Sequence, residues 1–279
     1  MHRFQLVDVF NDSPLSGNPL AVVFDADDMT TEQMQRMTRW LNLSETAFLV
    51  APTDPGADYR VRIFTLDREL PFAGHPTLGS CHAWLHGGGR PRNPAQIVQQ
   101  CAAGLISVRR NADTLAFASP PLLRGGEVDA EMLAKIVRFL HIEPEAILDA
   151  QWADNGPGWI ALVLESAAAV LALEPEQSFP GQLDLGVVGA YPPGGAVQFE
   201  LRAFFSDPQG AIREDPVTGS LNGSVAQRLL ATGRARSPYV ASQGTRLGGC
   251  GRIYVSADET GAVWVGGRTT TIVEGSHVG

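Results

Sequence analysis

The chain repeats part of its own pattern at an offset of half its length. Residues 59–64 read YRVRIF, and 140 positions later residues 199–204 read FELRAF. At the same offset and without a gap, residues 75–80 (HPTLGS) pair with residues 215–220 (DPVTGS). A duplication of this size predicts two lobes of like fold. A weaker echo at nearly the same offset joins residues 17–19 (GNP) and 155–157 (NGP).

Proline and glycine pairs mark the boundary between the two copies. Pro120-Pro121 and Gly125-Gly126 interrupt the periodic segments on either side, as is typical of a linker between lobes. We therefore expect an N-terminal lobe over residues 1–121 and a C-terminal lobe over residues 122–262.

Each copy is expected to wrap strands around one helix. In the N-terminal copy, strands are predicted at residues 4–10, 20–24 and 59–64. A helix is predicted from Thr31 to about Leu41, with Thr30 or Thr31 as its cap. A loop rich in proline and glycine then leads to an apolar segment with many small residues, at 78–85 in the first copy and 221–230 in the second. A helix so lined fits inside a curled sheet. The pattern predicts an α+β fold of two pseudo-symmetric lobes, each a mostly antiparallel curled sheet or barrel around a central helix.

The start of each central helix is a predicted anion site. Gly79-Ser80 and Gly219-Ser220 stand at the expected helix starts, where free N–H groups and the helix dipole favour negative charge. We expect the two starts to face each other across the cleft between the lobes and to hold a small carboxylate. An acidic protein without a basic cluster can bind an acidic substrate in this way.

Three side chains near these loops suit proton transfer. The repeated loops begin with His75 in one copy and Asp215 in the other, so equivalent backbone would carry a donor and an acceptor. Glu45 lies in an apolar stretch with Leu43 and Phe48. If that stretch is buried, desolvation raises the pKa of the carboxyl toward the range in which it can take and return a proton. Glu45 is a candidate base; a strand-edge glutamate facing water is the alternative.

Composition excludes several other classes of protein. Thirty acidic against 21 basic residues give a net charge of −9, which opposes nucleic-acid binding. The longest apolar run, residues 158–164, falls far short of the roughly 20 residues that a membrane helix needs. The single lysine, Lys135, lies on the polar side of an amphipathic helix pattern, which argues against a pyridoxal enzyme. The strand pattern follows directly on Met1, so we expect a cytoplasmic protein.

Motifs along nearly the whole chain resemble those of the PhzF-like phenazine-biosynthesis family, which shares the diaminopimelate epimerase fold. In chain order the motifs are residues 8–10 (DVF), 17–22 (GNPLAV), 42–46 (NLSET), 69–79 (ELPFAGHPTLG), 214–220 (EDPVTGS) and 243–244 (QG).

The resemblance implies a cofactor-free isomerase. The family's founding activity is the isomerisation of trans-2,3-dihydro-3-hydroxyanthranilate, in which a proton leaves one ring carbon and another arrives elsewhere on the conjugated system. It implies that Glu45 is the acid/base, with His75 and Asp215 as further catalytic residues. The implied substrate-binding residues are Asn18, Ser44, Gly74, Gly219 and Ser220. It also implies a homodimer, and a last strand within residues 263–279 that returns to the N-terminal lobe.

One turn departs from the family pattern. Relatives usually carry Gly-Arg-Pro-Ser after the QG motif, where this chain has Gly248 followed by Gly249-Cys250-Gly251. The change removes an arginine, a rigid proline and a hydroxyl together, so the local chain is expected to be less rigid while the fold is retained.

Two other functions fit part of the pattern. An amino-acid racemase or epimerase of the same fold would place one thiol in each repeated loop. This chain has His75 and Asp215 there, and its cysteines are elsewhere, at positions 81, 101 and 250. A protein that binds a small acid without turnover would also keep the fold. The acid/base residues favour an isomerase of the PhzF type over both the racemase or epimerase and the binding protein.

No metal or other cofactor is predicted. His82 and His86 are four residues apart and so share one helix face, but no carboxylate lies between them as in the zinc-protease helix. The expected partner is a small carboxylate substrate.

Overall fold

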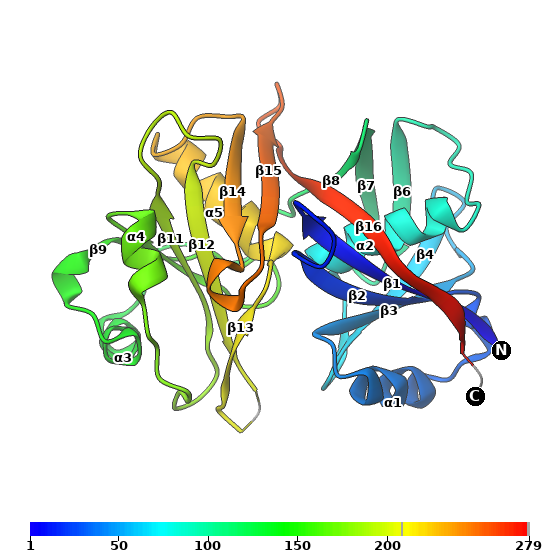
Figure 1. The fold of residues 1–279 in the computed structure, drawn as a ribbon, viewed down its shortest axis with the longest axis horizontal. Helices are drawn as coiled ribbons and strands as arrows, with labels where there is room; N and C mark the ends of the chain where they lie inside the picture. The colour runs from blue at the N-terminus through cyan, green and yellow to red at the C-terminus, as the bar shows by residue number, and fades with distance from the viewer. Residues whose placement is uncertain (208, 278–279) are drawn as a thin grey trace. The chain divides into compact units, whose positions relative to one another are not determined.

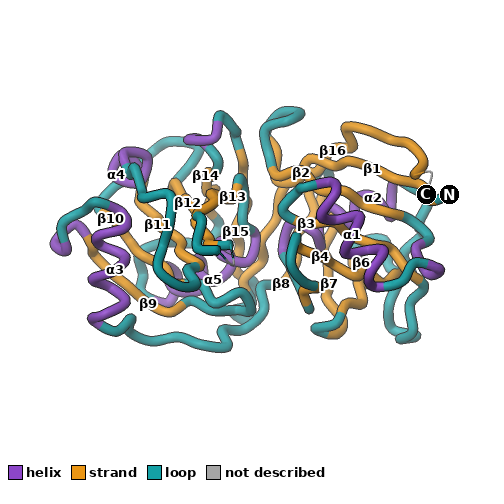
Figure 2. Tube along the Cα trace, turned by 90° about the horizontal axis from the view of Figure 1, so that it is seen from below, coloured by secondary structure: helices purple, strands orange, loops and turns teal. Residues whose placement is uncertain are grey.

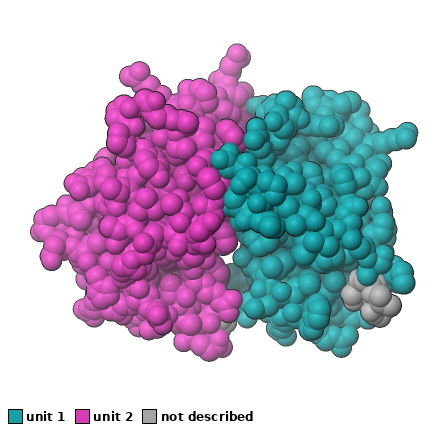
Figure 3. All heavy atoms as spheres, viewed as in Figure 1, with its two compact units in different colours: residues 1–118, 265–279 teal, residues 119–264 magenta. Residues whose placement is uncertain are grey.

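The computed structural model describes residues 1–207 and 209–277. The chain forms two compact units (Figure 3). Unit 1 comprises residues 1–118 and 265–279, and unit 2 comprises residues 119–264. No helix among the described residues is both long enough and apolar enough to cross a membrane.

Unit 1 is built on a sheet that closes on itself. Its strands are β1 (His2–Asn11), β2 (Asn18–Val23), β3 (Glu45–Val50), β4 (Tyr59–Thr65), β5 (Glu69–Leu70), β6 (Gln96–Cys101), β7 (Gly104–Asn111), β8 (Thr114–Ala118) and β16 (Val263–His277). Following the ladder, β1, β2, β3, β4, β6, β7, β8 and β16 are neighbours in that order, and β16 pairs back with β1. Figure 1 shows β16 running beside β1. Closure leaves this ring of strands without a free edge.

The helix α2 (Gly74–His86) packs against the strands of this barrel. Its residues from Gly74 to Cys81 are all buried. A Cβ on Gly79 would lie 2.5 Å from a side-chain carbon of Leu20 on β2, so glycine permits the close approach of helix and barrel.

The predicted start of this helix is wrong by four residues. We expected residues 78–85 with Gly79-Ser80 at the start, whereas α2 begins at Gly74 and holds Gly79-Ser80 in its interior. Pro76 does not delay the start, because the first turn of a helix has no intrahelical acceptor for its N–H groups, so a proline loses nothing there. His75 is therefore the second residue of the helix and not a loop residue.

The helix α1 (Thr31–Leu41) covers one face of β3 and β4, as Figure 2 also shows. The predicted cap is confirmed, because Thr30 and Gln33 form a reciprocal capping box. The face that α1 presents to the sheet contributes Met34 to a small core with Val23, Ala26, Phe48 and Phe64. The short helix η1 (Ala26–Asp28) precedes α1.

Unit 2 combines its own strands with the helix α5 (Gly219–Ala231). Its strands are β9 (Ile147–Trp152), β10 (Ile160–Leu164), β11 (Asp184–Ala190), β12 (Phe199–Ser206), β13 (Ile212–Asp215), β14 (Tyr239–Gln243) and β15 (Gly251–Ala257). The order is β9, β10, β11, β12, β14, β15, with β13 paired to β12. The remaining helices are α3 (Ala130–Leu140), η2 (Pro144–Ala146), α4 (Ala167–Ala172) and η3 (Thr245–Leu247). A Cβ on Gly186 would lie 2.3 Å from the Leu221 side chain, so a strand glycine makes room for α5 as a helix glycine does for α2.

Strands β1–β7 of unit 1 and β9–β15 of unit 2 share one topology, which confirms the predicted fold class. In unit 1, β1–β2, β3–β4, β4–β5 and β6–β7 are antiparallel, while β2–β3 and β4–β6 are parallel. In unit 2 the same directions recur in the pairs β9–β10, β11–β12, β12–β13 and β14–β15, and in β10–β11 and β12–β14. The fold is α+β, with two pseudo-symmetric lobes that each hold a central helix.

The register of the repeat changes along the chain, and the predicted loop pairing is wrong. The hairpin after β4 pairs Phe64 with Glu69, whereas the equivalent hairpin after β12 pairs Phe204 with Glu214 and is five residues longer. From there the offset is 145 instead of 140, so the helix starts Gly74 and Gly219 correspond. At this offset Ser220 is the counterpart of His75, and Asp215 is the counterpart of Leu70.

Candidate active site

In unit 1 the structure brings Glu45 and His75 together. Glu45 is the first residue of β3 and its side chain is 16% exposed, while the His75 side chain is 4% exposed at the start of α2. Glu45 Oε2 lies 3.6 Å from His75 Nε2. This separation is longer than that of a direct hydrogen bond.

Burial keeps the His75 imidazole neutral. Desolvation lowers the pKa of His75 to about 3, so the ring carries no charge near pH 7. Asn18 Nδ2 lies 3.5 Å from His75 Nδ1. An amide N–H can donate only to an unprotonated ring nitrogen, which leaves the proton on Nε2. In this tautomer the ring presents an N–H toward the Glu45 carboxylate.

A tight turn positions Asn18, the first and fully buried residue of β2. The Asp8 carboxylate accepts the backbone N–H groups of Ser16 at 3.1 Å and Gly17 at 3.0 Å. Burial raises the pKa of Asp8, although these hydrogen bonds oppose the shift. A Cβ on Gly17 would lie 2.2 Å from the Val9 carbonyl oxygen. The turn thus depends on a buried carboxylate and on a missing side chain.

Gly17→Ala is expected to destabilise unit 1 by about 1–3 kcal/mol, the usual cost of forcing a methyl group into packed atoms. The free energy of unfolding from urea titrations measures the effect. Gly275→Ala is the matched control, because a Cβ there meets nothing within 4 Å. Equal stability of the two variants would contradict the role given to this turn.

Two further predicted residues of unit 1 flank the pair. Ser44 is half-buried and directly precedes Glu45. Gly74 is the buried first residue of α2, so its N–H belongs to the turn that has no intrahelical acceptor.

In unit 2 a hydrogen-bonded network holds the loop that carries Asp215. Thr218 Oγ1 donates to Asp215 Oδ2 at 2.5 Å, and the Thr218 N–H donates to Gln243 Oε1 at 3.1 Å. The other end of the Gln243 amide donates to the Asp215 carbonyl at 3.1 Å. Asn222 also donates to Gln243 Oε1, at 2.9 Å. Sequence reasoning gave Thr218, Asn222 and Gln243 no role, although the motifs at residues 214–220 and 243–244 contained two of them.

Ser220 is the second residue of α5 and is held by two residues that sequence reasoning missed. Trp159 Nε1 donates to Ser220 Oγ at 3.0 Å, and Asn155 Nδ2 donates to the Ser220 carbonyl at 2.9 Å. The echo of residues 17–19 in residues 155–157 was the one signal that could have identified Asn155. Gly219, the other predicted residue here, begins the helix.

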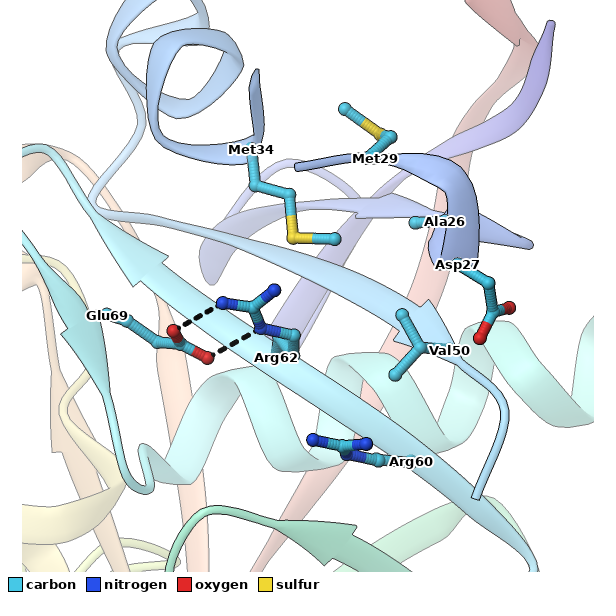
Figure 4. Close-up of a pocket in the computed structure, with 8 residues that line it drawn as sticks. All are labelled: Ala26, Asp27, Met29, Met34, Val50, Arg60, Arg62 and Glu69. Atoms are coloured by element: carbon cyan, nitrogen blue, oxygen red, sulfur yellow. Dashed lines mark hydrogen bonds and ion pairs between the residues drawn. The ribbon is translucent and has the colours of Figure 1, made fainter. Parts of the chain in front are cut away.

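A separate hollow of about 360 Å³ lies on the face of β3 and β4 that α1 covers (Figure 4). Neither Glu45 nor His75 lines it. Its lining residues are Ala26, Asp27, Met29, Met34, Val50, Arg60, Arg62 and Glu69. Arg62 pairs with both carboxylate oxygens of Glu69, at 2.8 and 2.6 Å. Arg202 and Glu214 repeat this pair in unit 2, so the ion pair is a duplicated support for the hairpins that lead into the central helices.

Within residues 1–207 and 209–277, no three histidine, cysteine, aspartate or glutamate side chains are grouped to hold a metal ion. His82 Nε2 contacts Thr271 Oγ1, and His86 Nδ1 contacts Glu274 Oε1, both at 2.9 Å. Burial raises the pKa of the Cys81 thiol to about 12, so it stays protonated.

Comparison with known proteins first defines the class. A 293-residue alignment with trans-2,3-dihydro-3-hydroxyanthranilate isomerase of Pseudomonas aeruginosa is 34% identical and covers 99% of each chain. Antisense-enhancing sequence 1 of Schizosaccharomyces pombe is 33% identical, with 98% of each chain covered. The structure of a predicted epimerase from Pseudomonas aeruginosa matches all of both chains at a TM-score of 0.81 and 28% identity. The chain is an isomerase by this relationship.

The family follows from the same comparison. Residues 7–275 match the family described as phenazine biosynthesis-like protein, PhzC-PhzF. The chain belongs to this family, as its motifs predicted.

Proposed function

We propose that this isomerase moves a proton on a small cyclic amino or hydroxy acid without a cofactor, and that its substrate is trans-2,3-dihydro-3-hydroxyanthranilate or a close analogue. The observation that carries the proposal is the buried contact of Glu45 with the neutral His75. The named activity of the Pseudomonas aeruginosa relative supports the substrate class.

In the proposed reaction Glu45 removes the proton from ring carbon C3. The double bonds of the conjugated ring shift, and the protonated Glu45, whose carboxyl proton can exchange with solvent, delivers a proton to another ring carbon. The atoms and charge of the substrate are unchanged in sum. Such positioned acid/base catalysis contributes about 10²- to 10⁴-fold.

A neutral His75 suits this task better than a charged one. An imidazolium beside Glu45 would stabilise the carboxylate and weaken it as a base, because an opposite charge at this range lowers the pKa of a carboxyl. The neutral ring still offers an Nε2–H donor that can orient a carboxylate or a substrate oxygen. Burial of His75 therefore preserves the basicity of Glu45.

The proposal assigns the substrate carboxylate to the helix starts. Gly74 in α2, and Gly219 with Ser220 in α5, offer N–H or O–H donors at the positive ends of helix dipoles. His75 and Asp215 are assigned to the amine and hydroxyl groups of the substrate, and Asn18 and Ser44 are proposed as further substrate-binding residues. We also propose a homodimer, as the family resemblance implies, and a cytoplasmic location; light scattering and fractionation would test these two proposals.

Incubation of the purified protein with trans-2,3-dihydro-3-hydroxyanthranilate in D₂O tests the proposal. We expect isomerised product with deuterium bound to a ring carbon by NMR, after dialysis against a chelator and with no added cofactor. Amino acids form the comparison panel, because exchange at their α-carbon would instead indicate an epimerase. Binding of the acids without any exchange would overturn the proposal in favour of a binding protein.

A further inference from the structure

The corrected register of the repeat makes Ser220 of α5 the counterpart of His75 of α2. Each of these residues is second in its helix, and each is contacted by an asparagine. Asn18 approaches the His75 ring at 3.5 Å, and Asn155 donates to the Ser220 carbonyl at 2.9 Å. The duplicated scaffold thus supports the same helix position in both copies.

Ser220 has an additional partner that fixes its hydroxyl. The Trp159 indole N–H can only donate, and it donates to Ser220 Oγ at 3.0 Å. A serine oxygen has two lone pairs and one hydrogen, so this bond occupies an acceptor site and leaves the hydrogen to point elsewhere. Among the described residues, none accepts a hydrogen bond from the Ser220 hydroxyl hydrogen.

The surroundings of Trp159 are rigid enough to aim its N–H. Its side chain is buried, and its carbonyl accepts the Ala153 N–H at 2.8 Å. The Asp154 carboxylate accepts the N–H groups of Gly156 at 2.7 Å and Gly158 at 2.8 Å, which ties the intervening loop together. The indole therefore approaches Ser220 from a fixed direction.

Asn155 has an unsatisfied carbonyl in this same place. The side-chain atom that contacts the Ser220 carbonyl must be the Asn155 nitrogen, because only the nitrogen can donate to a carbonyl. The other atom of this amide is therefore Oδ1, and it is buried without a hydrogen bond. A buried acceptor without a partner lowers stability. Stability of the fold therefore does not account for Asn155, whereas a role in holding Ser220 in place does.

We infer that Trp159, assisted by Asn155, is a positioning residue that turns Ser220 into a directed hydrogen-bond donor for an oxygen of an anionic ligand. The ligand class is a small carboxylate. That this carboxylate is the enzyme's substrate rests on the proposed function.

A double-mutant cycle tests the inference, with Trp159→Phe, Ser220→Ala and the two changes combined. Binding of 3-hydroxyanthranilate is measured by calorimetry, and kcat/KM is measured with the dihydro acid. We expect Ser220→Ala to weaken binding roughly tenfold to a hundredfold, as for a hydrogen bond to a charged group. Trp159→Phe should weaken it by about threefold to tenfold, and it should have no further effect when Ser220 is already alanine.

Trp264→Phe is the matched control. Trp264 is also a buried tryptophan, and its indole N–H also donates one hydrogen bond, to Asp258 Oδ2 at 2.8 Å. This variant should bind the acid as the unaltered protein does. If losing an indole hydrogen bond weakened binding only through a general structural effect, Trp159→Phe and Trp264→Phe would both bind the acid more weakly. Trp159→Phe would then also weaken binding in the protein that already carries Ser220→Ala.

The outcomes separate this inference from the proposed function. Normal binding by Trp159→Phe, or a full additional loss in the double variant, would overturn the role of Trp159. Binding without turnover by the unaltered protein would overturn the proposed function alone, and the cycle in binding would still decide the inference. Absence of binding by the unaltered protein would overturn both.

Discussion

Replacing Glu45 by Gln is expected to lower turnover of trans-2,3-dihydro-3-hydroxyanthranilate by about 10²- to 10⁴-fold. The amide has the size of the carboxylic acid and can still accept the Nε2–H of His75, but it cannot take up a proton. Deuterium uptake from D₂O should fall in parallel, because exchange and isomerisation share the same proton transfer. The affinity for 3-hydroxyanthranilate should change little, since the proposal assigns its carboxylate to the helix starts.

Glu274→Gln is the control for the loss of one carboxylate from the same unit. Glu274 lies on β16, is half-exposed, and contacts His86 instead of His75. This variant should retain the activity of the unaltered protein. Near-normal turnover by Glu45→Gln would refute the proposed base, and an equal loss in both variants would attribute the effect to net charge.

The elements that the sequence predicted well have short-range signals. The capping box of α1 depends on Thr30 and Gln33, three residues apart, and it is present as expected. The alternation of strand residues and the run of small residues after Gly74 are local in the same way. They were sufficient for the fold class because each copy of the repeat carries its own set.

What the sequence did not predict depends on contacts between distant residues. The five-residue shift of the repeat arises in one hairpin, where Glu214 pairs with Phe204 at twice the sequence separation of Glu69 and Phe64. No local pattern reveals such a shift, so Asp215 was paired with His75 in place of Leu70.

The supports of the candidate site were missed for the same reason. Trp159 reaches Ser220 across 61 positions and Asn155 reaches it across 65. Gln243 holds Thr218 across 25. Sequence reasoning identified side chains whose chemistry suits proton transfer. The uncharged residues that hold the site in place by hydrogen bonds are identified only by the tertiary structure.

His75 is expected to make the protein sensitive to acid, in a way that does not depend on the substrate. Its pKa is lowered from 6.5 to about 3 by burial, so between these values the unfolded chain binds a proton that the folded chain does not. Stability from this group is therefore lost as the pH falls below about 6.5. Between pH 7 and pH 4 the linkage amounts to a loss on the order of 3 kcal/mol in the free energy of unfolding.

The variant His75→Asn lacks the titrating group. From pH 7 to pH 4 the free energy of unfolding of this variant should therefore fall by less than that of the unaltered protein, and the difference should be on the order of 3 kcal/mol. Urea titrations at pH 7 and pH 4 give both differences, and the comparison holds even if the variant is less stable at every pH. His141→Asn, at the exposed C-cap of α3, is the control for the replacement of a histidine by asparagine, and its free energy of unfolding should fall more between pH 7 and pH 4 than that of His75→Asn. An unchanged pH dependence in His75→Asn would mean that the folded protein protonates this imidazole readily. Glu45 would then face a cation, and the argument that a neutral ring preserves its basicity would fail with it.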